Sequence, residues 1–366
     1  MEKNPLLDAR EIINETDKKI AELFLRRMEA VKSVAEYKMS KGLPVLDSKR
    51  EEEVIARNSE YLLGADEDIR SAYVKFLRET MAISRHYQDK LISGTKIAYS
   101  GVEGSFASIA IETIFPTARR VPYGNFTEAY YSVVNGECDL AVLPMENSHS
   151  GEVGGVTDLL FSGPLYVNST YDLEITHDLL VLPGADVKKI KRVVSHEQAL
   201  NQCDKFIKAR GYERIEYVNT ALAAEYVASL GDPTVAAIAS KEAARRYGLE
   251  IAEHGINESS VNTTRFAVIS PVRQKFSSTS ADMRFIIAFT VRNEAGSLAR
   301  AIEIIGKHGF NMHSLRSRPM KKLLWQYYFY IESEGNIDSR DGEQMLTELK
   351  EFCDQLKIIG SYSQRQ

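Results

Sequence analysis

The sequence has 366 residues, of which 44% are hydrophobic and 27% charged, and its formal net charge at pH 7 is -5. This balance is typical of a globular protein of two or three domains, and it excludes a disordered chain and a general attraction to nucleic acid or acidic membrane. Cys138, Cys203 and Cys353 predict neither a disulfide framework nor a zinc site, and without an apolar run of membrane-spanning length we expect a cytoplasmic protein.

Residues 5–91 contain few glycines or prolines, and their apolar residues recur at helical spacing, which predicts three helices. The first helix, of about 35 residues and about 50 Å, carries a continuous apolar stripe. The stripe consists of Ile12, Ile13, Ile20, Leu23, Phe24, Val31 and Val34. Because a small domain cannot cover such a stripe alone, we expect an intertwined homodimer or a higher homo-oligomer.

The third helix carries polar residues where apolar ones are expected. A buried stripe is predicted for Ile69, Tyr73, Phe76, Leu77 and Leu91. Ser84 and Gln88 fall on its continuation, and buried polar groups need partners, which are either a neighbouring helix or a ligand.

Basic residues on the first helix favour a ligand, rather than a neighbouring helix, as the partner of Ser84 and Gln88. Arg27 and Lys38 lie about 20° apart around the helix and share a face, so both are able to hold one small anion. Arg10 lies about 25 Å from Arg27 along the axis, and only an antiparallel partner subunit would bring it to that anion. At the start of the second helix, Ser48 and Glu51 have capping-box spacing, with Asp47 as the alternative cap.

The segments NPLLDAREII, RR at 26–27, Lys38, PVLDSKRE and Ser84 to Gln88 together resemble the all-helical chorismate mutase family, and we place this domain at residues 1–92. The resemblance implies that Arg10 of the other subunit and Arg27 bind the two carboxylates of chorismate, while Lys38 and Gln88 donate to its ether oxygen. It implies further contacts, to the ring hydroxyl and a carboxylate, from Asp47, Arg50, Glu51 and Ser84. The Claisen rearrangement needs only fixed donors, and because Gln88 is neutral at any pH we expect no acidic optimum.

After Ser93-Gly94-Thr95, short β-rich runs alternate with helical segments, which predicts α/β architecture. One set runs from KIAYS to DLAVLPMEN and a second from HDLLVLP to a helix at 241–247, so we expect two similar lobes. The turn from Gly101 to Ser105 lacks the third glycine and the acidic residue of a dinucleotide-binding fingerprint, and its helix N-terminus suits a carboxylate instead. The polar segment 271–281 is expected to be a linker.

Polar residues gather where these segments end. Glu146 and Asn147 come at the carboxyl end of a predicted strand, where α/β sheets bind ligands. Structural alternatives exist: Ser195 as a helix N-cap, Asn147 as a turn residue, His196 as a packed imidazole and Arg265 as a salt-bridge partner.

In this order, GVEGSFASIA, PMENSHSGEV, SHEQALNQC and NTTRF resemble the catalytic domain of prephenate dehydratases, which we place at residues 95–271. GVEGS departs from the family's usual proline and threonine. The resemblance implies a two-lobed fold like that of periplasmic binding proteins, with the substrate in the cleft. The implied site residues are Glu146, Asn147, Ser148, Ser195, Gln202, Thr264, Arg265 and Phe266.

Loss of carbon dioxide and of the ring hydroxyl makes prephenate aromatic, so the enzyme mainly has to protonate the departing hydroxyl. Thr264 is our predicted donor, Glu146 an alternative proton source and Arg265 the candidate for a substrate carboxylate. Gly151, Gly154 and Gly155 are the predicted mobile positions for closure of the cleft. We expect no cofactor, and the seven histidines show no metal-ligand pattern.

Residues 283–361 predict the order strand, helix, strand, strand, helix, strand of a ferredoxin-like α+β unit. NEAGSLARAIEII and LRSRP resemble the ACT regulatory domain, placed at 282–366, with Arg316 where glutamate is usual. The resemblance implies phenylalanine as an effector bound by Gly296, Ser297, Leu298, Ser317, Arg318 and Pro319. A purely architectural dimerisation module is the alternative.

Together these features predict a multidomain, bifunctional enzyme of phenylalanine biosynthesis that converts chorismate to prephenate and prephenate to phenylpyruvate, with feedback inhibition by phenylalanine. A noncatalytic sensor of aromatic metabolites is one alternative. A mutase fused to prephenate dehydrogenase is another, disfavoured because the nicotinamide fingerprint is incomplete.

Overall fold

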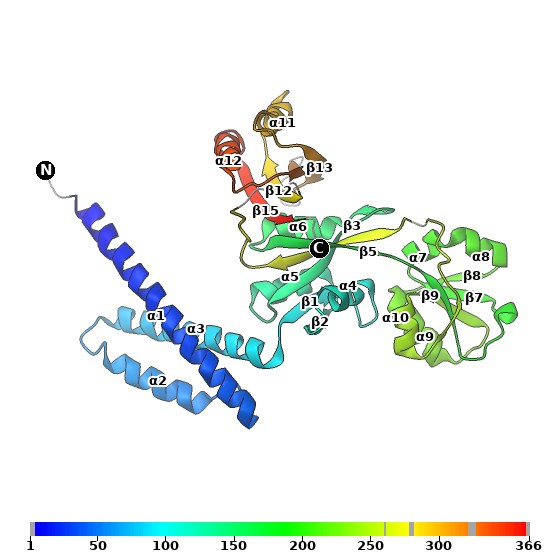
Figure 1. The fold of residues 1–366 in the computed structure, drawn as a ribbon, viewed down its shortest axis with the longest axis horizontal. Helices are drawn as coiled ribbons and strands as arrows, with labels where there is room; N and C mark the ends of the chain where they lie inside the picture. The colour runs from blue at the N-terminus through cyan, green and yellow to red at the C-terminus, as the bar shows by residue number, and fades with distance from the viewer. Residues whose placement is uncertain (1–3, 260, 278–281, 321–326, 364–366) are drawn as a thin grey trace. The chain divides into compact units, whose positions relative to one another are not determined.

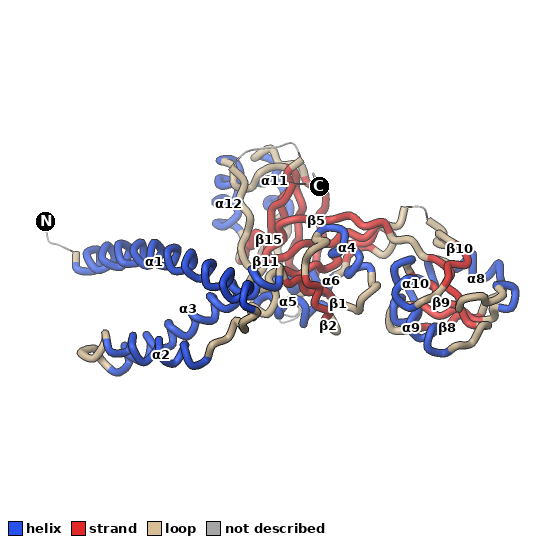
Figure 2. Tube along the Cα trace, turned by 60° about the horizontal axis from the view of Figure 1, so that its bottom comes forward, coloured by secondary structure: helices blue, strands red, loops and turns tan. Residues whose placement is uncertain are grey.

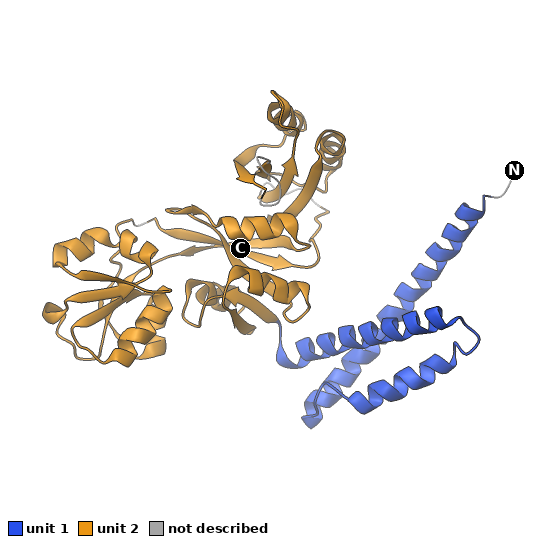
Figure 3. Ribbon diagram, turned by 180° about the vertical axis from the view of Figure 1, so that it is seen from behind, with its two compact units in different colours: residues 1–95 blue, residues 96–366 orange. Residues whose placement is uncertain are grey.

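The structure, a computed structural model, describes residues 4–259, 261–277, 282–320 and 327–363. It divides into two compact units, residues 1–95 and residues 96–366 (Figure 3). Each unit is described by itself.

The first unit is helical, as predicted, and consists of α1 (Pro5–Lys41), α2 (Ser48–Glu60) and α3 (Glu67–Ser93). Asn4 caps α1 by accepting from the Leu6 amide at 3.1 Å, and α1 ends at Gly42, whose φ of 63° is the left-handed conformation of a helix C-cap. Helix α3 packs against both α1 and α2, and the N-terminal half of α1 projects beyond them (Figure 1).

Most of the α1 stripe is uncovered within this chain. Ile12, Leu23 and Val34 are 67%, 64% and 44% exposed, while Val31 is buried. The expectation of a buried stripe on α3 was wrong for the single chain, since Ile69 and Phe76 are 58% and 51% exposed. Three helices in this arrangement have too few neighbours to cover both stripes.

The second unit contains two lobes (Figure 2). In lobe 1 the strands β1, β2 and β3 are parallel, and β11 runs antiparallel between β3 and β5. The strands of lobe 1 are β1 (Lys96–Ser100), β2 (Arg119–Tyr123), β3 (Leu140–Asn147), β4 (Gly151–Glu152), β5 (Tyr166–Glu174) and β11 (Thr263–Ser270), and its helices are α4 (Phe106–Ile114), α5 (Phe126–Val134) and α6 (Gly154–Ser162).

Lobe 2 is a five-stranded sheet in the order β10-β6-β9-β7-β8. Its strands are β6 (Asp178–Val181), β7 (Arg192–Ser195), β8 (Glu213–Glu216), β9 (Val235–Ala239) and β10 (Glu250–Glu253), with η1 (Val187–Lys189), α7 (Glu197–Gln202), α8 (Asp204–Arg210), α9 (Thr220–Leu230) and α10 (Lys241–Tyr247). The chain enters lobe 2 after β5 and returns before β11. The two crossing segments lie side by side, because the Ile175 amide donates to Asn262 O and the Ile256 amide to His177 O. The prediction of two lobes is confirmed.

The C-terminal module (residues 282–363) has the predicted order of elements. They are β12 (Met283–Thr290), α11 (Ser297–Lys307), β13 (Met312–Pro319), β14 (Tyr327–Glu334), α12 (Arg340–Phe352) and β15 (Gln355–Ser363). Strand β15 lies parallel to β5 through the pair Gly360 and Val167, so one sheet runs from lobe 1 into the module. A Cβ at position 360 would lie 2.0 Å from the carbonyl oxygen of Val167, so this junction requires glycine.

The segment predicted as a linker has no helix or strand over residues 271–277, and residues 278–281 lie outside the described residues. It is nevertheless anchored, because the Arg273 guanidinium donates to the carboxylate of Asp338 at 3.0 Å. The segment therefore attaches to the C-terminal module rather than standing free in solvent.

Candidate functional sites

A buried polar cluster lies between α1 and α3. Arg27 donates to the hydroxyl of Ser84 and to the carbonyl of Thr80, and burial lowers the pKa of its guanidinium. Ser84 and Gln88 are 4% and 8% exposed, and they share one face of α3 because they are four residues apart. The side-chain oxygen of Gln88 is buried without a hydrogen-bond partner among the described residues. Such an unpaired buried group is costly, so a ligand that hydrogen-bonds to the Gln88 amide would be favoured there.

The other residues predicted for the mutase site are placed around this unit. Asp47 is the N-cap of α2 and accepts from the Arg50 amide at 3.0 Å, so Asp47 rather than Ser48 caps the helix. Glu51 pairs with Arg85 of α3, and Lys38 donates to the carbonyl of Val45 at 2.5 Å.

Three of the predicted residues, Arg10, Asp47 and Arg50, lie on the surface of the single chain. Arg50 pairs with Glu53 at 3.5 Å on the exposed side of α2, and Arg10 is exposed near the start of α1. Arg27, Ser84 and Gln88 thus lie together between α1 and α3, whereas Arg10 and Arg50 do not lie near them within one chain.

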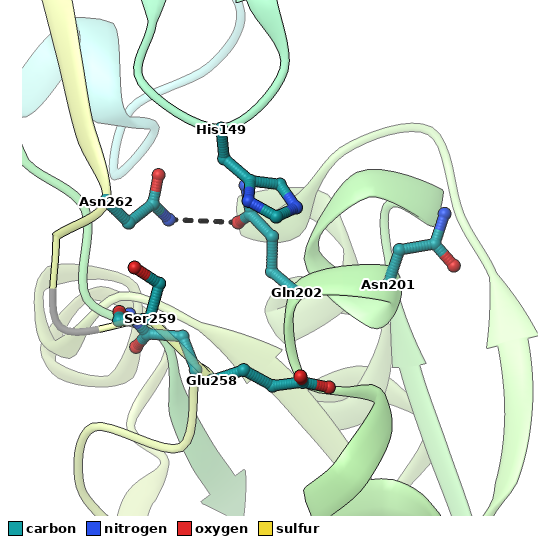
Figure 4. A pocket seen from close by; sticks show the side chains of 7 residues that line it. His149, Asn201, Gln202, Glu258, Ser259 and Asn262 are labelled. Atoms are coloured by element: carbon teal, nitrogen blue, oxygen red, sulfur yellow. Dashed lines mark hydrogen bonds between the residues drawn. The ribbon is translucent and has the colours of Figure 1, made fainter.

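In the second unit, a chain of amide hydrogen bonds crosses from lobe 1 to lobe 2. The Asn147 amide donates to Thr264 Oγ1 and to Asn262 Oδ1, both at 2.9 Å. Asn262 in turn donates to Gln202 Oε1 at 3.0 Å (Figure 4). The sheet residues of lobe 1 are thereby tied to α7 of lobe 2.

His177 closes this chain from the crossing segment. Its Nε2 lies 2.8 Å from Gln202 Oε1, and because that oxygen is an acceptor the ring carries its hydrogen on Nε2. Burial lowers the pKa of His177, so the imidazole is neutral at pH 7. Its Nδ1 is buried without a partner among the described residues.

These hydrogen-bonded side chains border a small polar pocket of about 40 Å³ between the lobes (Figure 4). The pocket is lined by His149, Asn201, Gln202, Asn257, Glu258, Ser259 and Asn262. Asn147 shapes its rim, because Asn147 Oδ1 accepts from the amides of His149 and Ser150 at 3.0 Å each. The expected turn role of Asn147 is therefore confirmed, and the structure adds its contact to Thr264.

Ser148 fixes the same rim to β11, accepting from the Thr263 amide at 3.0 Å and donating to the Val261 carbonyl at 3.1 Å. Asn262 and His177 were not among the predicted site residues. Asn262 opens the segment NTTRF, and a histidine separated by one residue from the apolar run LLV was the available signal for His177.

Glu146 and Arg265 lie on the opposite face of the sheet, because neighbouring strand residues alternate and these two are cross-strand partners. Glu146 pairs with Arg316 of β13. Arg265 contacts Asp172 at 3.0 Å and Glu332 at 3.5 Å, which confirms the salt-bridge interpretation. Burial lowers the pKa of Arg265, but the two carboxylates outweigh burial and raise it overall.

Ser195 and Phe266 are buried in the core. The Ser195 hydroxyl donates to the Ile238 carbonyl at 2.5 Å, and the N-cap of α7 is His196, whose Nδ1 accepts from the Gln198 amide at 3.2 Å. The N-cap expectation for Ser195 and the packed imidazole expected for His196 were therefore wrong. Phe266 is 2% exposed and belongs to the hydrophobic cluster around β1 and α4.

Among the described residues there is no group of three or more His, Cys, Asp or Glu side chains placed to hold a metal ion. None of the helices in the described part of the chain is both long enough and apolar enough to span a membrane.

The two units match two family models. Residues 9–89 match chorismate mutase type II, and residues 97–274 match prephenate dehydratase. Fold and site thus define an enzyme with a helical chorismate mutase domain ahead of a two-lobed prephenate dehydratase domain. The bifunctional chorismate mutase/prephenate dehydratase of Enterobacter agglomerans is 30% identical, over 98% of this chain and 96% of its own. The chain belongs to the family of bifunctional chorismate mutase/prephenate dehydratases.

Solved structures share the fold of the second unit. GqqA, described as a quorum quenching acylase, is 28% identical with a TM-score of 0.68, covering 73% of this chain and 97% of its own. The prephenate dehydratase of Arthrobacter aurescens, solved in complex with L-Phe, is 24% identical with the same TM-score, covering 74% of this chain and 90% of its own. The two family models and the full-length relative confirm the resemblances to a mutase and a dehydratase, whereas the solved structures add the shared fold of the second unit.

Proposed function

We propose that the two domains catalyse consecutive reactions, in which the helical domain rearranges chorismate to prephenate and the two-lobed domain converts prephenate to phenylpyruvate. The observation that carries the proposal is the set formed by the half-buried Arg27 with the buried Ser84 and Gln88, because an intramolecular rearrangement requires fixed hydrogen bonds and no nucleophile. The product of this domain is then the substrate of the second. Domain boundaries at 1–92, 95–271 and 282–366 belong to this proposal.

In the mutase site, Gln88 would bind the ether oxygen of chorismate. Rotation of its amide places the NH₂ group where the unpaired oxygen now lies, so the ligand would satisfy a group that is otherwise desolvated at a cost. Lys38 would leave the Val45 carbonyl to donate to the same ether oxygen, and Arg27 would bind a carboxylate. Asp47, Arg50, Glu51 and Ser84 complete the proposed contacts.

A second copy of the chain would complete this site and cover α1. The exposed stripe supports the proposal, because burying a leucine or isoleucine contributes about 1.5 to 3 kcal/mol. An antiparallel α1 of the partner would bring its Arg10 to the second carboxylate of chorismate.

In the dehydratase site, Thr264 would donate a hydrogen bond to the departing ring hydroxyl or relay a proton to it from water. Its Oγ1 already accepts from Asn147, so its single hydrogen is available for the substrate. Asn147, Ser148 and Gln202 would position the substrate from both lobes. We assign Glu146 and Arg265 a supporting role behind the strands, since both are engaged by ion pairs on the other face.

Substrate entry would require the lobes to open. The pocket of about 40 Å³ is far below the roughly 300 Å³ of a small-molecule site. We propose that opening occurs at the crossing segments around His177 and Asn262 rather than at the predicted glycines, because Gly154 and Gly155 form the first turn of α6. Closure would then exclude water.

The C-terminal module would be an ACT domain that binds phenylalanine. Gly296 has a φ of +89° at the start of α11, and a cavity beside it is lined by Leu298, Tyr327 and Phe329. These residues offer an apolar surface for an aromatic side chain. Isothermal titration with phenylalanine tests this assignment, and no heat of binding at millimolar phenylalanine would leave the module an architectural one.

The main proposal is tested by supplying chorismate to the full-length protein without any cofactor. We expect chorismate to be consumed and phenylpyruvate to form. The ultraviolet absorbance of phenylpyruvate measures its formation. If prephenate accumulated unchanged, activity would be confined to the helical domain. If chorismate remained intact, the chain would be a binding protein.

A further inference from the structure

Two carboxylates face each other across the short hairpin of β3 and β4. Glu146 and Glu152 are directly opposed in register, an arrangement that destabilises a strand pair when both are ionised. Glu152 Oε1 is also buried without a hydrogen-bond partner among the described residues. The turn of this hairpin carries Ser148 and His149 of the proposed dehydratase site. The position of the pocket rim therefore depends on a hairpin that contains two opposed carboxylates.

Strand β13 of the C-terminal module supplies one arginine to each carboxylate. Arg316 pairs with Glu146, and Arg318 NH1 lies 3.6 Å from Glu152 Oε2. The two arginines are two residues apart and lie on one face of β13. Their side chains are 24% and 23% exposed, so solvent screens these pairs less than it screens surface ion pairs.

Arg318 is itself held in place from α6. It contacts Asp158 through two hydrogen bonds of 2.8 and 3.2 Å, and the Tyr328 hydroxyl donates to the same carboxylate at 2.7 Å. Its guanidinium also lies against Gly154, where an added Cβ would be 2.1 Å from NH1. The arginine therefore has one favoured position, fixed by the first turns of α6.

We propose that Arg316 and Arg318 form a clamp that positions the β3–β4 hairpin, so that strand β13 of the C-terminal module sets the geometry of the dehydratase pocket. This inference rests on the proposed dehydratase function. Both arginines are positioning residues: Arg316 acts through Glu146, whose neighbour Asn147 holds Thr264. A glutamate at position 316, the usual residue in the ACT resemblance, would bring a third negative charge to the hairpin. Arginine makes this contact attractive.

The first test compares dehydratase turnover with supplied prephenate in full-length variants, with the circular dichroism spectrum and thermal midpoint of each variant as the control for folding. Arg316→Ala is expected to lower kcat about tenfold with little change in KM, because the pocket is formed but misplaced. Arg316→Lys should recover most of the loss. Arg316→Ala combined with Glu146→Gln should exceed Arg316→Ala alone, because the opposed charges are then relieved. Arg340→Ala, on the exposed start of α12, is the matched control and should equal the wild type.

Gly154→Ala provides a variant that keeps both arginines. The new methyl group displaces Arg318 from Asp158 and Glu152, so dehydratase kcat should fall although both arginines are retained. Unchanged kcat in both Gly154→Ala and Arg316→Ala would overturn the clamp, as would a double variant no better than Arg316→Ala.

Hydrogen exchange separates this inference from the proposed function. The amides of Ser148, His149, Ser150 and Val153 are hydrogen-bonded within the hairpin and its turn or to β11. In Arg316→Ala they are expected to exchange several-fold faster than in the wild type, whether or not the protein turns over prephenate. Absence of wild-type turnover would refute the dehydratase proposal alone, and unchanged exchange would refute the clamp alone.

Discussion

Replacement of Thr264 by valine removes one hydroxyl and keeps the shape of the side chain. The structural cost is small, because the Asn147 amide retains two acceptors, Asn262 Oδ1 at 2.9 Å and the Thr263 carbonyl at 3.3 Å. We expect a loss of about 1 kcal/mol in the free energy of unfolding. The catalytic cost is larger, because a positioned proton donor contributes about 10²- to 10⁴-fold, or about 3 to 5 kcal/mol in the barrier.

The assay is formation of phenylpyruvate from supplied prephenate, with chorismate consumption by the same sample as the internal control. Thr263→Val is the matched variant, since its side chain lies one position away in β11 and therefore points to the other face. We expect Thr264→Val to lose at least a hundredfold in dehydratase kcat, whereas the dehydratase kcat of Thr263→Val should stay near that of the wild type. The mutase rate of each variant should also stay near the wild-type rate. Full turnover in Thr264→Val would refute the role of this hydroxyl.

Three further changes test other parts of the molecule. Gln88→Leu should raise the free energy of unfolding by about 1 kcal/mol, because the buried unpaired oxygen is removed, and lower mutase kcat at least a hundredfold. Chemical denaturation and chorismate absorbance measure the two effects, and a variant that kept its mutase rate would exclude Gln88 from the site. His177→Asn should flatten the acid side of the stability profile: the unfolded histidine gains a proton below about pH 6.5 while the buried ring resists it, so the wild type loses stability as pH falls through that range. Urea denaturation at pH 7.5 and pH 5.5 should give a smaller difference for the variant, and equal differences would contradict this account. Gly360→Ala should lower stability by about 1 to 3 kcal/mol, because the new methyl group meets the rigid Val167 carbonyl. A thermal midpoint equal to that of the wild type would show that this strand junction tolerates a side chain.

The order of elements was predictable from the sequence because each segment carries its own periodicity. The 37 residues of α1 and the βαββαβ order of the C-terminal module follow from local patterns of apolar residues. The joining of β15 to β5 was not predictable in the same way. It depends on one close approach between Gly360 and Val167, and glycines occur at many other places in this sequence for other reasons.

The burial of α3 shows how far periodicity reaches. An apolar stripe predicts a covered surface without saying which molecule covers it. On α3 the polar residues Ser84 and Gln88 are buried within the chain, whereas Ile69 and Phe76 are not. The pattern therefore predicted the correct face of α3, but the prediction that this chain alone buries the apolar residues on that face was wrong.

The dehydratase motifs show a different limit. Glu146 and Asn147 stand together in the sequence, as do Thr264 and Arg265, but each pair straddles a sheet and its members point to opposite faces. Asn147 and Thr264 meet at the pocket, while Glu146 and Arg265 meet ion pairs from the C-terminal module. A sequence motif alone does not show that its adjacent residues lie in these two different environments. The partner that separates them, Arg316, lies 170 residues beyond Glu146, and only the folded sheet brings the two side chains together.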